Sequence, residues 1–298
     1  MTTRKIVNVA SVPKRSPFRY PGGKTWLVPL ARKWWKSLDR KPELLIEPFA
    51  GGGIIGLTAA FEDFADHVIL VEKDPDVVAV WKCICSELYP ILRNRILRFE
   101  VTEQNVRQTL ADESQSVEEI AFRTIIKNRR FHGGILAPGA SLMKSGENGK
   151  GLKSRWYAKT LADRITAIGE IRHRFTVIEG DAIDVVFSHK NNRNAVFFID
   201  PPYTASGKKA GSRLYRHCDL DHSALFELTA SLHGEFLMTY DAAEGVRELA
   251  TRSKFDMELV AMKNTHHAKM TELLIGRDLA WSRQDSNSHR QVEFNFDA

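Results

Sequence analysis

The stretch AVFFIDPPY, from Ala195 to Tyr203, limits the possible folds of this chain more than any other. Five consecutive apolar residues, two of them aromatic, are typical of a short strand that is buried on both faces. The two prolines cannot donate hydrogen bonds to a sheet, so they end the strand abruptly. Open α/β sheets bind their ligands at the carboxyl ends of their strands. The stretch therefore predicts a site at such an end, built from Asp200, Pro201, Pro202 and Tyr203.

This strand end could hold an aromatic amine. A planar ring could stack on Tyr203 while its exocyclic amine donates hydrogen bonds to the Asp200 carboxylate and the Pro201 carbonyl. With both hydrogens engaged, the nitrogen lone pair can be turned towards an electrophile. The alternative is a plain strand end in which Asp200 accepts hydrogen bonds from nearby backbone amides. The stretch alone does not separate the two interpretations.

An earlier segment, from Glu43 to Phe61, predicts a strand, a glycine-rich turn and a helix. Three successive glycines, Gly51 to Gly53, let the backbone approach a ligand closely where the helix begins. The pattern is not the GxGxxG of dinucleotide-binding domains, so it supports NAD binding only weakly. The next strand, Val68 to Glu72, leads to Asp74, which is placed either to bind ribose hydroxyls or to cap a helix. Both interpretations of Asp74 stay open.

The rest of the chain alternates between helical and strand patterns. Helices are expected near residues 77–92, 157–172, 220–232 and 243–251, and strands at 175–179, 235–240, 257–262 and 271–275. This alternation with a late hairpin predicts a mostly parallel sheet that is covered by helices on both faces. The run from Gly22 to Thr25 is not a phosphate-binding P-loop, because Phe18 stands where that motif requires its first glycine.

Positive charge is concentrated in two regions of a chain whose formal net charge is +6. Residues 1–24 carry six basic side chains and no acidic one, and residues 123–164 carry ten basic side chains against two acidic ones. Such polarisation predicts that a polyanion docks against these two regions, although two solvated basic loops would give the same pattern. Aromatic residues near the long basic loop (Phe131, Trp156 and Tyr157) would suit wedging into a duplex.

Several classes of protein are disfavoured by what the sequence lacks. No apolar run approaches the ~18 residues that span a membrane, and the first residues lack the apolar core of a secretory signal. The three cysteines have no metal-type spacing, which predicts a reducing, cytoplasmic location. The histidines lack ligand spacing too, so we expect no metal site.

Three motifs together resemble those of the DNA adenine methyltransferase (Dam) family. They are PFRYPGGK at Pro17–Lys24, EPFAGGG at Glu47–Gly53 and DPPY at Asp200–Tyr203. Weaker matches extend the resemblance to nearly the whole chain, at Lys127–Gly134, Met238–Leu249 and Thr271–Ile275. The resemblance implies an α/β, Rossmann-like S-adenosylmethionine-dependent methyltransferase fold, with a mostly parallel seven-stranded sheet, a late hairpin and a mainly helical target-recognition insertion.

The same resemblance implies a reaction and a set of residues. The methyl group of S-adenosylmethionine would pass, without a metal, to the exocyclic amino nitrogen of a flipped-out adenine in double-stranded DNA, at specific sites. Catalysis would fall to Asp200, Pro201, Pro202 and Tyr203. The implied cofactor-binding residues are Tyr20, Lys24, Glu47, Phe49, Gly51, Gly53, Asp74, Asp181, Ala182 and Asp200. The residues expected to bind DNA are Arg123, Lys127, Arg129, Arg130, Lys144, Lys153 and Arg155.

We expect residues 1–83 and 173–298 to form the catalytic domain and residues 84–172 to form the insertion that recognises DNA. A monomer is plausible. DPPY also occurs in methyltransferases that act on RNA or on protein amides, so such substrates remain alternatives, as does an inactive DNA-binding relative. The polarised charge and the length of the basic insertion favour DNA, and the intact DPPY motif favours an active enzyme.

Overall fold

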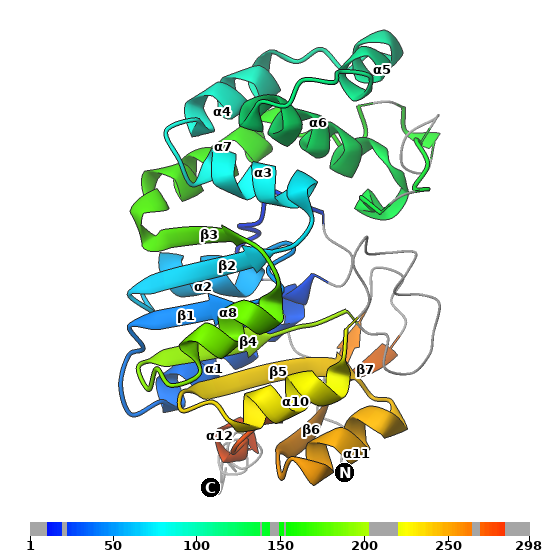
Figure 1. Cartoon of the computed structure of the whole chain (residues 1–298). Coiled ribbons are helices and arrows are strands. Elements are labelled where there is room, and N and C mark those ends of the chain that lie inside the picture. The colour runs from blue at the N-terminus through cyan, green and yellow to red at the C-terminus, as the bar shows by residue number, and fades with distance from the viewer. Residues whose placement is uncertain are drawn as a thin grey trace, which may run out of the picture.

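The computed structural model describes residues 11–19, 23–137, 139–143, 149–151, 153–202, 220–263 and 269–283. Within them, seven strands form one sheet in the order β3-β2-β1-β4-β5-β7-β6 (Figure 1). The strands are β1 (Leu44–Glu47), β2 (His67–Glu72), β3 (Phe175–Glu179), β4 (Ala195–Ile199), β5 (Glu235–Asp241), β6 (Asp256–Lys263) and β7 (Lys269–Gly276). The first five are parallel, and β7 runs antiparallel to β5 and β6. The predicted mostly parallel sheet with a late hairpin is confirmed.

Helices cover both faces of this sheet, because each strand alternates apolar side chains between two hydrophobic clusters (Figure 1). In β1, Leu45 belongs to one cluster and Ile46 to the other. The Leu45 side is covered by the short helix η1 (Lys24–Leu27) and by α1 (Val28–Ser37), α2 (Ile54–Phe61) and α12 (Ala280–Arg283). The Ile46 side is covered by α8 (Ala182–His189), α10 (His222–Ala230) and α11 (Glu244–Arg252).

A further group of helices lies beyond β3 at one edge of the sheet (Figure 1). It comprises α3 (Pro75–Ile84), α4 (Tyr89–Arg98), α5 (Glu103–Leu110), α6 (Val117–Arg130) and α7 (Ala158–Glu170). Helix α6 packs on α3, and α7 packs on α4. Phe122 and Ile165 from this group belong to the same hydrophobic cluster as Leu45, so these helices share their core with the sheet. The division of the chain at residues 84 and 172 stays a prediction.

The single helix expected over residues 77–92 is wrong, because the chain forms α3 and α4 with a break between Ile84 and Tyr89. Pro90 lies in the first turn of α4, where its missing N–H is harmless, whereas inside one continuous helix it would remove a backbone hydrogen bond. Helices α5 and α6 follow. Their starts are capped by Thr102 and Ser116, whose side chains accept hydrogen bonds from backbone N–H groups.

No helix among the described residues is long and apolar enough to cross a membrane.

The packing of α7 on α4 predicts a specific cost for Gly169→Ala. A Cβ at Gly169 would lie 2.4 Å from the Tyr89 ring, so one side chain or one helix would have to move. We expect a loss of stability of about 1–3 kcal/mol, measured by urea unfolding. The control is Gly245→Ala in α11, where a Cβ meets nothing within 4 Å and the change should stabilise the helix by up to ~1 kcal/mol. Equal effects of the two changes would contradict the α4–α7 packing.

Candidate active site

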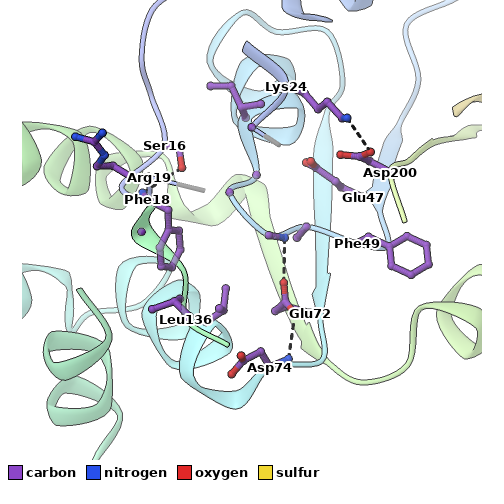
Figure 2. A pocket seen from close by; sticks show the side chains of 18 of the residues that line it. Ser16, Phe18, Arg19, Lys24, Glu47, Phe49, Glu72, Asp74, Leu136 and Asp200 are labelled. Atoms are coloured by element: carbon purple, nitrogen blue, oxygen red, sulfur yellow. Dashed lines mark hydrogen bonds and ion pairs between the residues drawn. The ribbon is translucent and has the colours of Figure 1, made fainter. Parts of the chain in front are cut away.

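The site is created by the parallel pairing of β1 with β4. Leu44 lies opposite Ala195 and Ile46 opposite Phe197, so the carboxyl ends of the two strands lie at the same edge. Strand β2 flanks β1 on the other side, so the connections diverge at this point, which is where open α/β sheets form a crevice. A cavity of about 830 Å³ opens there, and both Glu47, after β1, and Asp200, after β4, line it (Figure 2).

The glycine-rich loop after β1 is held tightly against its surroundings. Gly51 and Gly53 have φ angles of 45° and 61°, in the left-handed region that favours glycine. The Trp81 indole N–H donates a hydrogen bond to the Gly51 carbonyl at 3.0 Å. A Cβ on Gly53 would lie 2.9 Å from the Trp81 ring. The loop can therefore present its backbone to a ligand in a single conformation.

Glu72, at the end of β2, ties this loop to the next one (Figure 2). Its carboxylate accepts hydrogen bonds from the backbone N–H groups of Gly51 and Asp74, each at 3.0 Å, and of Lys73 at 2.8 Å. Burial raises the pKa of Glu72, which these three hydrogen bonds oppose. Glu72 was not predicted from the sequence as a site residue. An acid that ends a buried strand beside a glycine-rich loop is the signal that could have found it.

Two aspartates on the cavity wall begin helices. The Asp74 side chain accepts a hydrogen bond from the Asp76 N–H at 3.0 Å and caps α3. The Asp181 side chain accepts one from the Ile183 N–H at 2.9 Å and caps α8, and it also forms an ion pair with Lys73 at 2.9 Å. The helix-cap interpretation of Asp74 is therefore confirmed. It does not exclude a role towards a ligand, because both aspartates line the cavity.

Glu47 is buried between β1 and α2. Its Oε2 accepts a hydrogen bond from the Gly56 N–H at 2.7 Å, and a Cβ on Gly56 would lie equally close to this oxygen. Burial raises the pKa of Glu47 to about 8; the Gly56 hydrogen bond lowers it and the negative charge of Asp200 adds to the rise. At neutral pH the Glu47 carboxyl is therefore mostly protonated in the folded protein.

Asp200 lies in a network that joins four elements. The Lys24 ammonium, on η1, is 3.2 Å from Asp200 Oδ1 and 2.7 Å from Glu272 Oε2, on β7. The Thr239 hydroxyl, on β5, donates a hydrogen bond to the same Oδ1 at 2.8 Å. Burial alone would lower the pKa of Lys24, but the charges of Asp200 and Glu272 raise it above its ordinary value. Neither Thr239 nor Glu272 was predicted from the sequence as a site residue.

The cavity brings most of the predicted cofactor and catalytic residues together. Phe49, Ala182 and Pro202 line it beside the residues already described, while Pro201 is buried next to Asp200. Tyr20, Tyr203 and Lys144 lie outside the described residues.

Most of the residues predicted to bind DNA make their contacts within the protein. Arg129, Arg130 and Arg155 are almost fully buried. Their guanidinium groups donate hydrogen bonds to the backbone carbonyls of Pro17 at 2.5 Å, Met143 at 3.1 Å and Phe131 at 3.2 Å, in that order. These hydrogen bonds hold neighbouring backbone segments together, and Arg129 also lines the cavity. The sequence does not reveal which guanidinium groups make such internal contacts, and the role of these three arginines towards DNA stays a prediction.

The remaining predicted DNA contacts divide into two kinds. Arg123 donates hydrogen bonds to the Asp112 and Ser114 carbonyls, and Lys127 forms an ion pair with Asp76 at 2.9 Å. Both therefore have partners within the protein. Lys153 is exposed.

A family model for D12 class N6 adenine-specific DNA methyltransferases matches residues 20–265. The chain belongs to this family. The protein is thus a methyltransferase that uses S-adenosylmethionine to methylate adenine in DNA, as its three motifs predict. The α/β sheet described above is the Rossmann-like sheet of such enzymes.

Solved structures that are similar to this methyltransferase include three at low identity. A putative RNA methyltransferase from Pyrococcus horikoshii is 14% identical, with 92% of this chain and 91% of that chain covered and a TM-score of 0.38. A methyltransferase from Geobacter sulfurreducens is 12% identical, with 88% and 80% covered and a TM-score of 0.36. An rRNA methyltransferase from Streptomyces viridochromogenes is 17% identical, with 84% of each chain covered and a TM-score of 0.34. A search of curated proteins found no match.

The raised pKa of Glu47 predicts how stability changes with pH. Between its ordinary pKa of 4.5 and its folded pKa of about 8, the unfolded methyltransferase is ionised at Glu47 while the folded form keeps the proton. Stability from this group is therefore lost as pH rises through this window. Glu47→Gln should remove the loss, so that its stability relative to the wild type rises by roughly 1–4 kcal/mol from pH 5 to pH 8.5.

The measurement is urea unfolding at both pH values. The control is Glu43→Gln, at the exposed start of the same segment. Its free energy of unfolding should differ from that of the wild type by the same amount at both pH values. A Glu47→Gln difference that is independent of pH would contradict the buried, protonated carboxyl.

Proposed function

We propose that the cavity holds one adenine, turned out of duplex DNA, beside the methyl donor. The observation that carries this proposal is the pairing of β1 with β4, which puts the glycine-rich loop and Asp200 at one edge of the sheet. The Asp200 side chain is only 22% exposed. An adenine that stays stacked in a duplex cannot bring its amino group to so buried a carboxylate, so the target base has to leave the helix.

The half of the cavity next to β1 and β2 suits S-adenosylmethionine. Gly51 and Gly53 give a close backbone surface, and Asp74 and Asp181 supply carboxylate acceptors at the wall, suited to ribose hydroxyls and to the donor's adenine amine. A volume of about 830 Å³ has room for such a molecule and a base together. The donor supplies a methyl group made electrophilic by the neighbouring sulfonium. Phe49 and Ala182 complete this half.

The half next to β4 suits the target adenine. The Asp200 carboxylate and the Pro201 carbonyl would accept the two hydrogens of the amino group, which turns the nitrogen lone pair towards the methyl donor. Tyr203, which is outside the described residues, would stack on the base. The prolines hold this segment extended, so the acceptors are in place before the base arrives.

Catalysis by these residues is mainly placement and charge. Transfer of the methyl group, with the sulfur of the donor as leaving group, would make the amino nitrogen cationic. The Asp200 carboxylate, accepting a hydrogen bond from that nitrogen, stabilises the developing charge. The methylated nitrogen then loses a proton easily, through Asp200 or directly to water, so no strong base is required. Alignment of nitrogen, carbon and sulfur in one line contributes the rest.

The DNA would lie against the rim of the cavity at Tyr157 and Thr160. Tyr157 lines the cavity and is 63% exposed, and Lys153 and Lys159 near it are exposed as well. By contrast, Trp156 packs edge-to-face on Phe99, with ring centroids 5.5 Å apart. Tyr157 is therefore better suited than Trp156 to fill the space that an everted base leaves.

The first prediction of this proposal concerns the product. Wild-type protein incubated with labelled S-adenosylmethionine and unmethylated duplex DNA should yield N6-methyladenine on nucleoside analysis. Structured RNA of similar length should gain no more label than the Asp200→Ala variant transfers to DNA, because the family acts on DNA. Label in RNA or protein but not in DNA would overturn the proposal.

The second prediction concerns Tyr157. Tyr157→Ala should lower the single-turnover rate of duplex methylation about 10-fold or more, since base–aromatic contacts contribute roughly 1–3 kcal/mol. The loss should be smaller when the target adenine is mismatched, because a mismatched base costs less to evert.

The matched control for Tyr157 is Phe187→Ala. Phe187 is an aromatic residue with similar exposure, 56%, on α8, and it does not line the cavity. Its removal should leave the rate unchanged on both duplexes. Identical losses on matched and mismatched DNA for Tyr157→Ala would reject a wedge.

A further inference from the structure

A second carboxylate, from Glu272, lies close to Asp200 in the cavity. Glu272 is on β7, opposite Asp241 of β5, and only 5% of it is exposed. It lines the cavity together with Lys24 and Asp200. A carboxylate this deeply buried is strongly disfavoured unless a positive group balances it. The packing of β7 alone therefore does not account for a carboxylate at this position.

Lys24 supplies that balance, and it supplies it to both acids at once. Its ammonium lies 2.7 Å from Glu272 Oε2 and 3.2 Å from Asp200 Oδ1, and it is itself only 4% exposed. Figure 2 shows Lys24 reaching across the top of the cavity towards Asp200. The long lysine stem has several rotatable bonds, so a single contact at 3.2 Å would not hold the ammonium in one place. The shorter contact with Glu272 fixes the ammonium.

Thr239 acts on the same atom from the other side. Its hydroxyl donates to Asp200 Oδ1 at 2.8 Å, from the strand that pairs with both β4 and β7. Two donors on Oδ1 restrict the rotation of the Asp200 carboxylate about its bond to Cβ. They thereby fix the direction in which the other oxygen, Oδ2, presents its lone pairs to a base.

We propose that Glu272 is a positioning residue, which anchors Lys24 so that Lys24 and Thr239 together hold Asp200 in the orientation that receives the adenine amine. This inference rests on the proposed function of Asp200. The Asp200 carboxylate, once held in this orientation, is placed to stabilise the positive charge that develops on the amino nitrogen.

The charges that act on Lys24 provide a test that separates this role from a purely structural one. Among the described residues, Asp200 and Glu272 act on Lys24, while Glu47 after β1 and Tyr240 on β5 are close enough to Asp200 for its charge to raise their pKa values. Glu272 is one of the two charges that raise the pKa of Lys24 against the effect of burial. Without that charge, Lys24 should lose its proton at a lower pH, and the anchor of Asp200 would be lost with it.

The experiment is the pH profile of kcat for DNA methylation by Glu272→Gln. We expect kcat at neutral pH to fall at least 10-fold, the KM for S-adenosylmethionine to change less than about 3-fold, and the alkaline limb to move to lower pH by about one unit or more. Glu272→Asp keeps the charge, so it should retain the wild-type alkaline limb. A Glu272→Gln profile that is parallel to that of the wild type would overturn the proposal.

Two further variants make the result decisive. Glu258→Gln removes a carboxylate from the neighbouring strand β6, where it accepts a hydrogen bond from Ser282 at 2.8 Å outside the cavity, and its profile should match the wild type. Thr239→Val removes the hydroxyl donor with little change of shape, and should lower kcat with the alkaline limb unmoved. If Glu272→Gln fails to fold, an unchanged kcat for Thr239→Val overturns the proposal by itself. Absence of N6-methyladenine from wild-type reactions would instead reject the proposed function.

Discussion

The structure depends first on the parallel pairing of β1 with β4. These two short strands are far apart in the sequence, yet their registered pairing puts the loop after Glu47 beside Asp200. Every other part of the site is arranged around that edge. Strand β2 brings Glu72 and Asp74 to one side of it, and strands β5 and β7 bring Thr239 and Glu272 to the other. One half of the cavity therefore suits a nucleoside donor and the other an acceptor amine.

Buried and partly buried carboxyl groups determine which reaction this edge of the sheet can support. Glu72 accepts three backbone hydrogen bonds and keeps two loops together, while Glu47 is mostly protonated at neutral pH and so adds little charge. Asp200 and Glu272, by contrast, share the Lys24 ammonium. These four carboxyl groups lie in a strand, at the end of a strand or directly after a strand of the same sheet. They differ in role because their surroundings differ. A carboxylate held beside the acceptor is suited to a reaction in which an amine becomes cationic.

The sequence was most informative where residue type and spacing leave few alternatives. The prolines after Asp200 correctly predicted the end of β4, and the glycines after Phe49 correctly predicted the loop after β1, because few backbone conformations accept those residues. Thr239 and Glu272 could not be predicted, since their contacts with Asp200 and Lys24 depend on the register of a hairpin far away in the sequence. The internal contacts of Arg129 and Arg130 could not be predicted for a related reason. Their guanidinium groups bind carbonyls of segments that only the fold brings close. Helix α8 was not predicted, because Asp181, whose side chain caps this helix, was interpreted only as a cofactor-binding residue.

The central claim is that the carboxylate after β4 receives the amino group of an everted adenine while the glycine-rich loop holds the methyl donor. The most direct measurement is the distance from the Asp200 carboxylate to the target N6 atom, in a crystal structure with duplex DNA and an unreactive analogue of S-adenosylmethionine. The account predicts a hydrogen bond of about 2.6–3.2 Å, with the analogue against Gly51 and Gly53. A target adenine still stacked in the duplex, or held by other residues away from Asp200, would contradict it.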